Sequence, residues 1–186
     1  MSTAALAWKD RKRPLWLLSL LVPSLIGAGP LLAAGFGHPG WLWAPILIAY
    51  VLLPLADLLI GEDRSNPPES EVPALEEDRY YRYITWAVVP LLWVWWVFAA
   101  WYASSVDLAW PSWLALALST GLVGGFCINA GHELGHKKTR LERILAQWVL
   151  APTAYGHFVI EHNRGHHRDV ATPADPASAR MGESIW

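Results

Sequence analysis

Long apolar runs alternate with short polar segments along this chain, and the runs have the length that a membrane-spanning helix requires. We predict four transmembrane helices, at residues 15–36, 41–60, about 84–102 and about 112–130. Each run approaches the roughly 20 apolar residues that cross the hydrocarbon core of a bilayer. Residues 61–82 are rich in Pro and Glu and too polar to enter the bilayer, so we expect a surface loop there.

A fifth apolar run, residues 144–160, is interrupted by Pro152 and Gly156 and separates two groups of histidines. If this run crossed the bilayer, the two groups would lie about 30 Å apart, too far to share a site. We therefore predict a bent, half-buried helix that dips into the membrane and returns to the same side. The pattern indicates an all-α polytopic integral membrane protein, with residues 1–186 in a single membrane-embedded domain.

Basic residues indicate the orientation of these helices. Four basic residues stand within 9–13, before the first run, and four more stand within 137–143, after the fourth run. Cytoplasmic ends of membrane helices carry such an excess of Lys and Arg. Four crossings that begin in the cytoplasm also end there, so we expect the N-terminus and both histidine groups on the cytoplasmic face.

The composition agrees with a membrane protein. The chain is 54% hydrophobic and 16% charged, and its 13 Trp are more than an average soluble domain contains. The net charge of −2 and the absence of a basic-aromatic pattern give no indication of nucleic-acid binding. The single cysteine, Cys127, excludes an internal disulfide and a Cys-based zinc or iron–sulfur site made by this chain alone.

The histidines carry the candidate chemistry. His132 and His136 lie in HELGH, and His162, His166 and His167 lie in EHNRGHH. Residues four apart share one face of a helix, so His132 can pair with His136, and His162 with His166. Neutral imidazoles held this closely favour a transition-metal site, although imidazole alone does not distinguish Fe from Zn, Cu or Ni.

Two kinds of enzyme remain open on this evidence. HELGH matches HExxH, in which two histidines hold zinc and the glutamate is the general base of a metalloprotease. A protease of that type needs one further ligand, whereas the second group offers three more histidines. Many histidines in apolar surroundings favour two metal ions and redox chemistry on a hydrocarbon.

The same segments resemble a known family. HELGHKK and EHNRGHHRDVATPADPASARMGES are similar to the first two histidine boxes of the membrane alkane 1-monooxygenases, within the fatty acid desaturase/hydroxylase group. The segment GEDRSNPPE resembles the loop after the second span of this family. The resemblance covers nearly the whole chain, and the residues after the second box distinguish alkane hydroxylases from desaturases.

The resemblance implies a non-haem di-iron enzyme of the bacterial inner membrane, which uses O2 to hydroxylate the terminal carbon of medium- or long-chain alkanes. It implies that the catalytic iron ligands include His132, His136, His162, His166 and His167. The electrons would come from rubredoxin, which an NAD(P)H-dependent reductase reduces. A third histidine box, expected after Trp186 by this resemblance, would lie outside the chain. We therefore expect an N-terminal fragment with little activity of its own.

Carboxylates near the boxes are candidates to orient the ligands. Metal-bound histidines usually donate their other N–H to a carboxylate or carbonyl, and Glu133, Glu161 and Asp175 are placed to accept such a bond. Each could instead form an ordinary surface ion pair with a neighbouring arginine.

The second predicted span offers a candidate substrate channel. Ala49, Leu53 and Asp57 recur at four-residue steps and so share one helix face. An alkane has no group to hydrogen-bond, so channel depth must set the chain length that is accepted. The alternative is that this face contacts lipid or a neighbouring helix.

Overall fold

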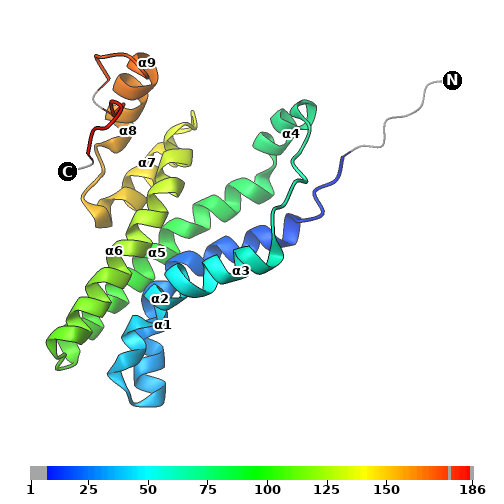
Figure 1. The fold of residues 1–186 in the computed structure, drawn as a ribbon. Helices are drawn as coiled ribbons and strands as arrows, with labels where there is room; N and C mark the ends of the chain where they lie inside the picture. Colours follow the sequence, from blue (N-terminus) through cyan, green and yellow to red (C-terminus); the bar gives the residue numbers. More distant parts are fainter. Residues whose placement is uncertain (1–7, 176, 185–186) are drawn as a thin grey trace. The chain divides into compact units, whose positions relative to one another are not determined.

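The computed structural model describes residues 8–175 and 177–184, and these residues form helices, turns and loops without any β-strand (Figure 1). The chain divides into two compact units, Met1–Val123 and Gly124–Trp186, and the long helix α6 (Trp110–Gly135) continues from the first into the second. The predicted all-α fold is confirmed. The prediction that residues 1–186 form a single domain stays a prediction.

Four helical segments of the described residues are long and apolar enough to cross a membrane. They are Arg13–Phe36, Pro39–Ile60, Arg79–Ser105 and Trp110–Gly135. These segments contain the four predicted spans and extend them by a few residues at most ends. The predicted number of transmembrane helices is confirmed.

Each of the first two spans combines more than one kind of helix. The first comprises a 3₁₀-helix, Arg13–Leu20, and α1 (Leu21–Phe36). The second begins with a 3₁₀-turn, Pro39–Trp43, and continues through α2 (Ala44–Leu47), a π-helical turn at Ile48–Leu52 and α3 (Leu53–Ile60).

A proline gives the physical reason for the π-helical turn. Pro54 has no N–H, and its ring would clash with the carbonyl four residues earlier in a regular helix. A wider turn just before the proline relieves this crowding. Such a turn also alters the four-residue spacing of side chains in the second span.

The third span, α5 (Arg79–Ser105), packs closely on α1. Trp95 Nε1 donates a hydrogen bond to Ser24 Oγ at 3.0 Å, and a methyl group on Gly27 would lie 2.0 Å from the Trp95 ring. A larger residue at position 27 would clash with the Trp95 indole, so glycine at this position allows the indole to contact the backbone of α1. Leu92 and Ile26 are fully buried in this unit.

Polar contacts join the start of the chain to the segment before α5. The loop after α3 contains a 3₁₀-turn, Glu69–Glu71, and α4 (Val72–Glu77). Arg13 donates two hydrogen bonds to Asp78, at 2.6 and 3.2 Å, and Lys12 forms an ion pair with Asp63. The Arg13 guanidinium lowers the pKa of Asp78. These pairs agree with a loop that returns to the side of the N-terminus.

The second unit contains a helical hairpin that lies along the last turns of α6. Thr139 caps α7 (Arg140–Leu150) by accepting a hydrogen bond from the Glu142 N–H at 3.2 Å. After a 3₁₀-turn, Ala151–Thr153, and the left-handed residue Ala154 (φ 56°), the chain reverses into α8 (Phe158–Glu161). Two short helical segments follow, a π-helix at His162–His166 and α9 (His167–Asp169).

Glycines of α6 show how deep the hairpin reaches. Methyl groups on Gly124, Gly131 and Gly135 would lie 2.8, 2.7 and 3.2 Å from side-chain atoms of Thr153, Leu150 and Val159 respectively. Gly124 and Gly135 are about 16 Å apart along the helix, or roughly half of the hydrocarbon thickness. The run therefore reverses along α6, and its predicted dip into the membrane stays a prediction. It reverses as two helices joined by a turn, because Pro152 and the left-handed Ala154 end α7 and its 3₁₀ extension.

Candidate metal centre

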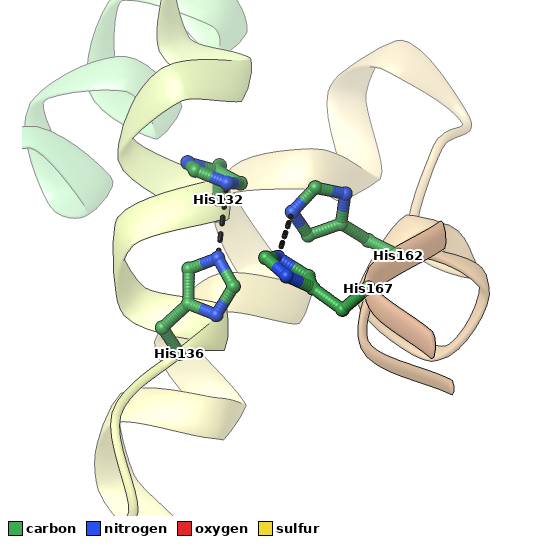
Figure 2. A group of neighbouring side chains, drawn as sticks. All are labelled: His132, His136, His162 and His167. Atoms are coloured by element: carbon green, nitrogen blue, oxygen red, sulfur yellow. Dashed lines mark hydrogen bonds between the residues drawn. The ribbon is translucent and has the colours of Figure 1, made fainter. Parts of the chain in front are cut away.

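The first histidine pair lies at the C-terminal end of α6. His132 is in the last turn of the helix, and His136 follows its last residue, with the His136 N–H bonded to the His132 carbonyl at 3.3 Å. This helical spacing places the two rings on one face, as the sequence predicted. Their Nε2 atoms are 3.0 Å apart (Figure 2).

The second pair is His162 and His167, which are five residues apart. Their Nε2 atoms are also 3.0 Å apart (Figure 2). The π-helix at His162–His166 explains this pairing, because a wider turn brings residues i and i+5 together. The sequence spacing had paired His162 with His166 on the assumption of a regular α-helix.

The two pairs meet in one cluster (Figure 2). One ring nitrogen from each of His132, His136, His162 and His167 lies within 4.8 Å of the other three. Two nitrogens bound to the same ion at about 2.1 Å can be at most about 4.2 Å apart. The widest separation allowed here exceeds that limit by about 0.6 Å, and a tetrahedral site needs nitrogens only about 3.4 Å apart, so the four imidazoles must move closer to bind one ion.

His166 lies beside this cluster and has a different partner. Its Nδ1 is 2.8 Å from Oδ2 of Asp175, whose side chain is fully buried. Ser178 Oγ also donates to Asp175 Oδ2, and the Ala177 N–H donates to Oδ1 at 3.0 Å. With Nδ1–H donated to Asp175, the Nε2 atom of His166 is left as the ligating atom.

The surroundings keep two of the clustered histidines neutral. Burial, with repulsion from neighbouring histidines, lowers the pKa of His162 to about 4. The same two causes lower the pKa of His136. Hydrogen bonds from Ser178, the Ala177 N–H and His166 lower the pKa of Asp175, so this residue is a carboxylate at neutral pH. Neutral imidazoles are the form that binds metals.

Comparisons with known proteins agree with this arrangement. Residues 108–186 match the fatty acid desaturase family. An alkane 1-monooxygenase of Alcanivorax borkumensis is 51% identical over 177 residues, which are 95% of this chain and 44% of that relative. Alkane 1-monooxygenases of Ectopseudomonas oleovorans and Pseudomonas putida are 49% and 46% identical over the same shares. This chain is similar to the alkane 1-monooxygenases over 95% of its length.

The resemblance of the chain to the alkane 1-monooxygenases is thus confirmed, and both histidine groups lie in the part that matches the desaturase family. The chain spans 44% of the length of these alkane 1-monooxygenases.

Two of the three candidate orienting carboxylates are exposed. Glu133 forms an ion pair with Lys137 at 2.7 Å on the outer face of α6, and Glu161 is exposed at the end of α8. The third, Asp175, contacts a histidine directly. An orienting role for these carboxylates in an alkane 1-monooxygenase stays a prediction.

The candidate channel residues lie in the first unit. Leu53 and Asp57 are exposed on α3, whereas Ala49 is half-buried in the π-helical turn. The π-helical turn Ile48–Leu52 includes Ala49 and ends just before Leu53, so their four-residue spacing no longer places them on the same helix face. Their role as a substrate channel of an alkane 1-monooxygenase stays a prediction.

Two residues that sequence reasoning missed contact the centre. Phe158 stacks on His162, with ring centroids 4.7 Å apart and planes at 20°, and its centroid is 6.2 Å from that of His132. The spacing of four between Phe158 and His162 is a signal that could have indicated this contact. Asn163 Nδ2 donates to the Gly135 carbonyl at 3.1 Å, which no local pattern indicates.

Proposed function

We propose that this chain supplies part of the metal centre of a membrane alkane 1-monooxygenase. The reaction takes O2, two electrons and two protons. One oxygen atom enters a terminal C–H bond and gives a primary alcohol, and the other leaves as water. The four-histidine cluster at the end of an apolar helix carries this proposal, and the related alkane 1-monooxygenases support it. Because the chain spans 44% of those relatives, the activity is proposed for the whole protein.

The proposed cofactor is a pair of non-haem iron ions. His132, His136, His162 and His167 would hold one ion, and His166 offers a further ligand beside them. Bound iron would supply the activation of O2. The surroundings lower the pKa values of His136 and His162, and Asp175 would fix the orientation of His166.

Apolar side chains would keep water away from the reacting carbon. Phe158 covers one face of His162, and Leu134, between His132 and His136 in sequence, is buried. An alkane dissolves in the bilayer and offers no polar group for recognition. A centre beside membrane-spanning helices can therefore receive its substrate directly from the hydrocarbon region.

The proposed electron donor is a rubredoxin, with an NAD(P)H-dependent reductase, on the cytoplasmic side of the bacterial inner membrane. Lys138 and Arg143 are exposed close to the first histidine pair in sequence. Their charge would steer an acidic partner, with an association rate that falls as salt screens the interaction.

Charge reversal in Lys138→Glu or Arg143→Glu should raise the rubredoxin concentration needed for half-maximal rate without changing alkane affinity. An unchanged requirement at low salt would contradict this docking face.

The alternative of a zinc metalloprotease has less support. In HExxH proteases the glutamate activates the metal-bound water, whereas here Glu133 is paired with Lys137. The second histidine group also exceeds what such a site needs.

Metal analysis and isotope labelling of the whole protein test this proposal. We expect two irons per chain, and ¹⁸O from ¹⁸O2 in the terminal alcohol when alkane and reduced rubredoxin are supplied. His136→Ala should lower the iron content and abolish the alcohol, because it removes one ligand. One zinc per chain together with peptide hydrolysis would support the protease.

A further inference from the structure

A hydrogen bond between the two histidine boxes has no part in the metal chemistry described so far. Asn163 Nδ2, one residue after His162, donates to the carbonyl of Gly135, one residue before His136, at 3.1 Å. Gly135 is the last residue of α6, where the carbonyl groups have no partner within the helix. The amide therefore satisfies a helix-end carbonyl and links the two boxes at the same time.

A close backbone approach reinforces this link. A methyl group on Gly135 would lie 3.2 and 3.3 Å from the two γ-carbons of Val159. Contacts this short require the Val159 side chain to give by a few tenths of an ångström, so a side chain at position 135 would press on α8 where it meets α6. Val159 lies three residues before His162, and a shift of α8 would carry His162 with it.

Metal binding requires that the ring nitrogens of the two histidine pairs lie close together. The four ring nitrogens lie within 4.8 Å of one another, and they come from two separate segments, the end of α6 and the π-helix after α8. His132, in the last turn of α6, and His136, just after it, are held together by the hydrogen bond from the His136 N–H to the His132 carbonyl. The distance between this pair and the pair His162 and His167 depends on contacts between the segments.

We propose that Asn163 is a positioning residue for the metal centre, and that its bond to the Gly135 carbonyl, with the Gly135–Val159 contact, sets the spacing between the two histidine pairs. This inference rests on the proposed metal site and not on the alkane chemistry. Asn163 holds no metal; it fixes the turn that carries His162 against the helix that carries His136.

Cobalt binding by the purified whole protein in detergent tests this role. Co²⁺ alone is the probe, because its visible absorption reports both affinity and coordination geometry. Loss of a contact that supports the metal ligands typically weakens metal binding roughly 10- to 100-fold.

Asn163→Ala and the isosteric Asn163→Asp, which removes the donor, should both raise the Kd for Co²⁺ by such a factor and alter the shape of the absorption band. Asn163→Gln keeps a donor and should recover part of the affinity. The matched control is Arg164→Ala, an exposed neighbour in the same turn, which should bind like the wild type.

A second pair of variants separates positioning from folding. Gly135 does not have a left-handed backbone, and alanine has a higher helix propensity than glycine, so a weaker Co²⁺ site in Gly135→Ala does not indicate a weaker helix. Val159→Ala in the same chain makes room for the new methyl group and should restore the wild-type spectrum. A wild-type whole protein without Co²⁺ binding would overturn the metal site and this inference together. Wild-type binding that Asn163→Ala and Gly135→Ala leave unchanged would overturn the inference alone.

Discussion

At the scale of single residues, the carboxylate of Asp175 has the clearest consequence for metal binding. Its side chain is buried against His166, Ser178 and the Ala177 N–H. Asp175→Asn keeps the size but removes the charge that holds the His166 Nδ1–H, so iron affinity of the whole protein should fall roughly 10- to 100-fold. Asp169→Asn is the matched control, because Asp169 pairs with the exposed Arg168. Equal iron affinity in both variants, measured by titration, would show that Asp175 does not orient the ligand.

The lowered pKa of His162 predicts how the metal-free chain responds to acid. The folded-state pKa is about 4 and the ordinary value is 6.5, so between these values the unfolded chain binds more protons than the folded one. Stability should therefore fall as the pH is lowered through this window. The thermal midpoint should decrease from about pH 7 to about pH 5, and less so in His162→Phe, which cannot bind that proton. An equal decrease in both proteins would remove His162 as the cause.

At the scale of elements, the reversal of the hairpin depends on a strained residue. Ala154 has a left-handed backbone, with φ 56°, which costs an L-residue roughly 1–2 kcal/mol. Ala154→Gly should relieve this strain and stabilise the chain by about 1 kcal/mol, after allowance for the greater freedom of glycine in the unfolded state. Thermal unfolding in detergent should show a midpoint about 2–4 °C higher.

A neighbouring alanine provides the control for this variant. Ala151 is exposed and has a right-handed helical backbone, with φ −62°. Ala151→Gly should destabilise the chain by roughly 0.5–1 kcal/mol, because only the entropic cost of glycine remains. If both variants lower the midpoint, the left-handed residue is not a source of strain.

The same elements show which features could be predicted from sequence. The four spans follow from hydropathy, and the His132–His136 pair follows from helical spacing, since both depend on local pattern alone. The pairing of His162 with His167 depends on a π-helical turn, which has no distinct sequence signal. The Asn163–Gly135 bond joins residues 28 positions apart and depends on the fold of the hairpin. In the second span another π-helical turn displaces Ala49 from the regular spacing.

At the scale of the whole molecule, the orientation in the membrane is the property that determines which partners reach the metal centre. Asp107, between α5 and α6, and Lys138, after α6, are both exposed and lie beyond opposite ends of one span. The excess of basic residues at 137–143 predicts that Lys138 lies in the cytoplasm. A membrane-impermeant thiol reagent should therefore label Asp107→Cys in intact cells, and should label Lys138→Cys only after the membrane is opened.

The tip of the hairpin gives this labelling experiment its third site. Tyr155 is partly exposed just after the reversal at Ala154, at a depth of roughly half the hydrocarbon layer if α6 spans the bilayer. Tyr155→Cys should then resist the reagent from both sides, whereas a hairpin that crossed would be labelled from the outside. The natural Cys127 is 2% exposed, so its background should be low. Labelling of Lys138→Cys in intact cells would reverse the orientation and place the histidines away from a cytoplasmic electron donor.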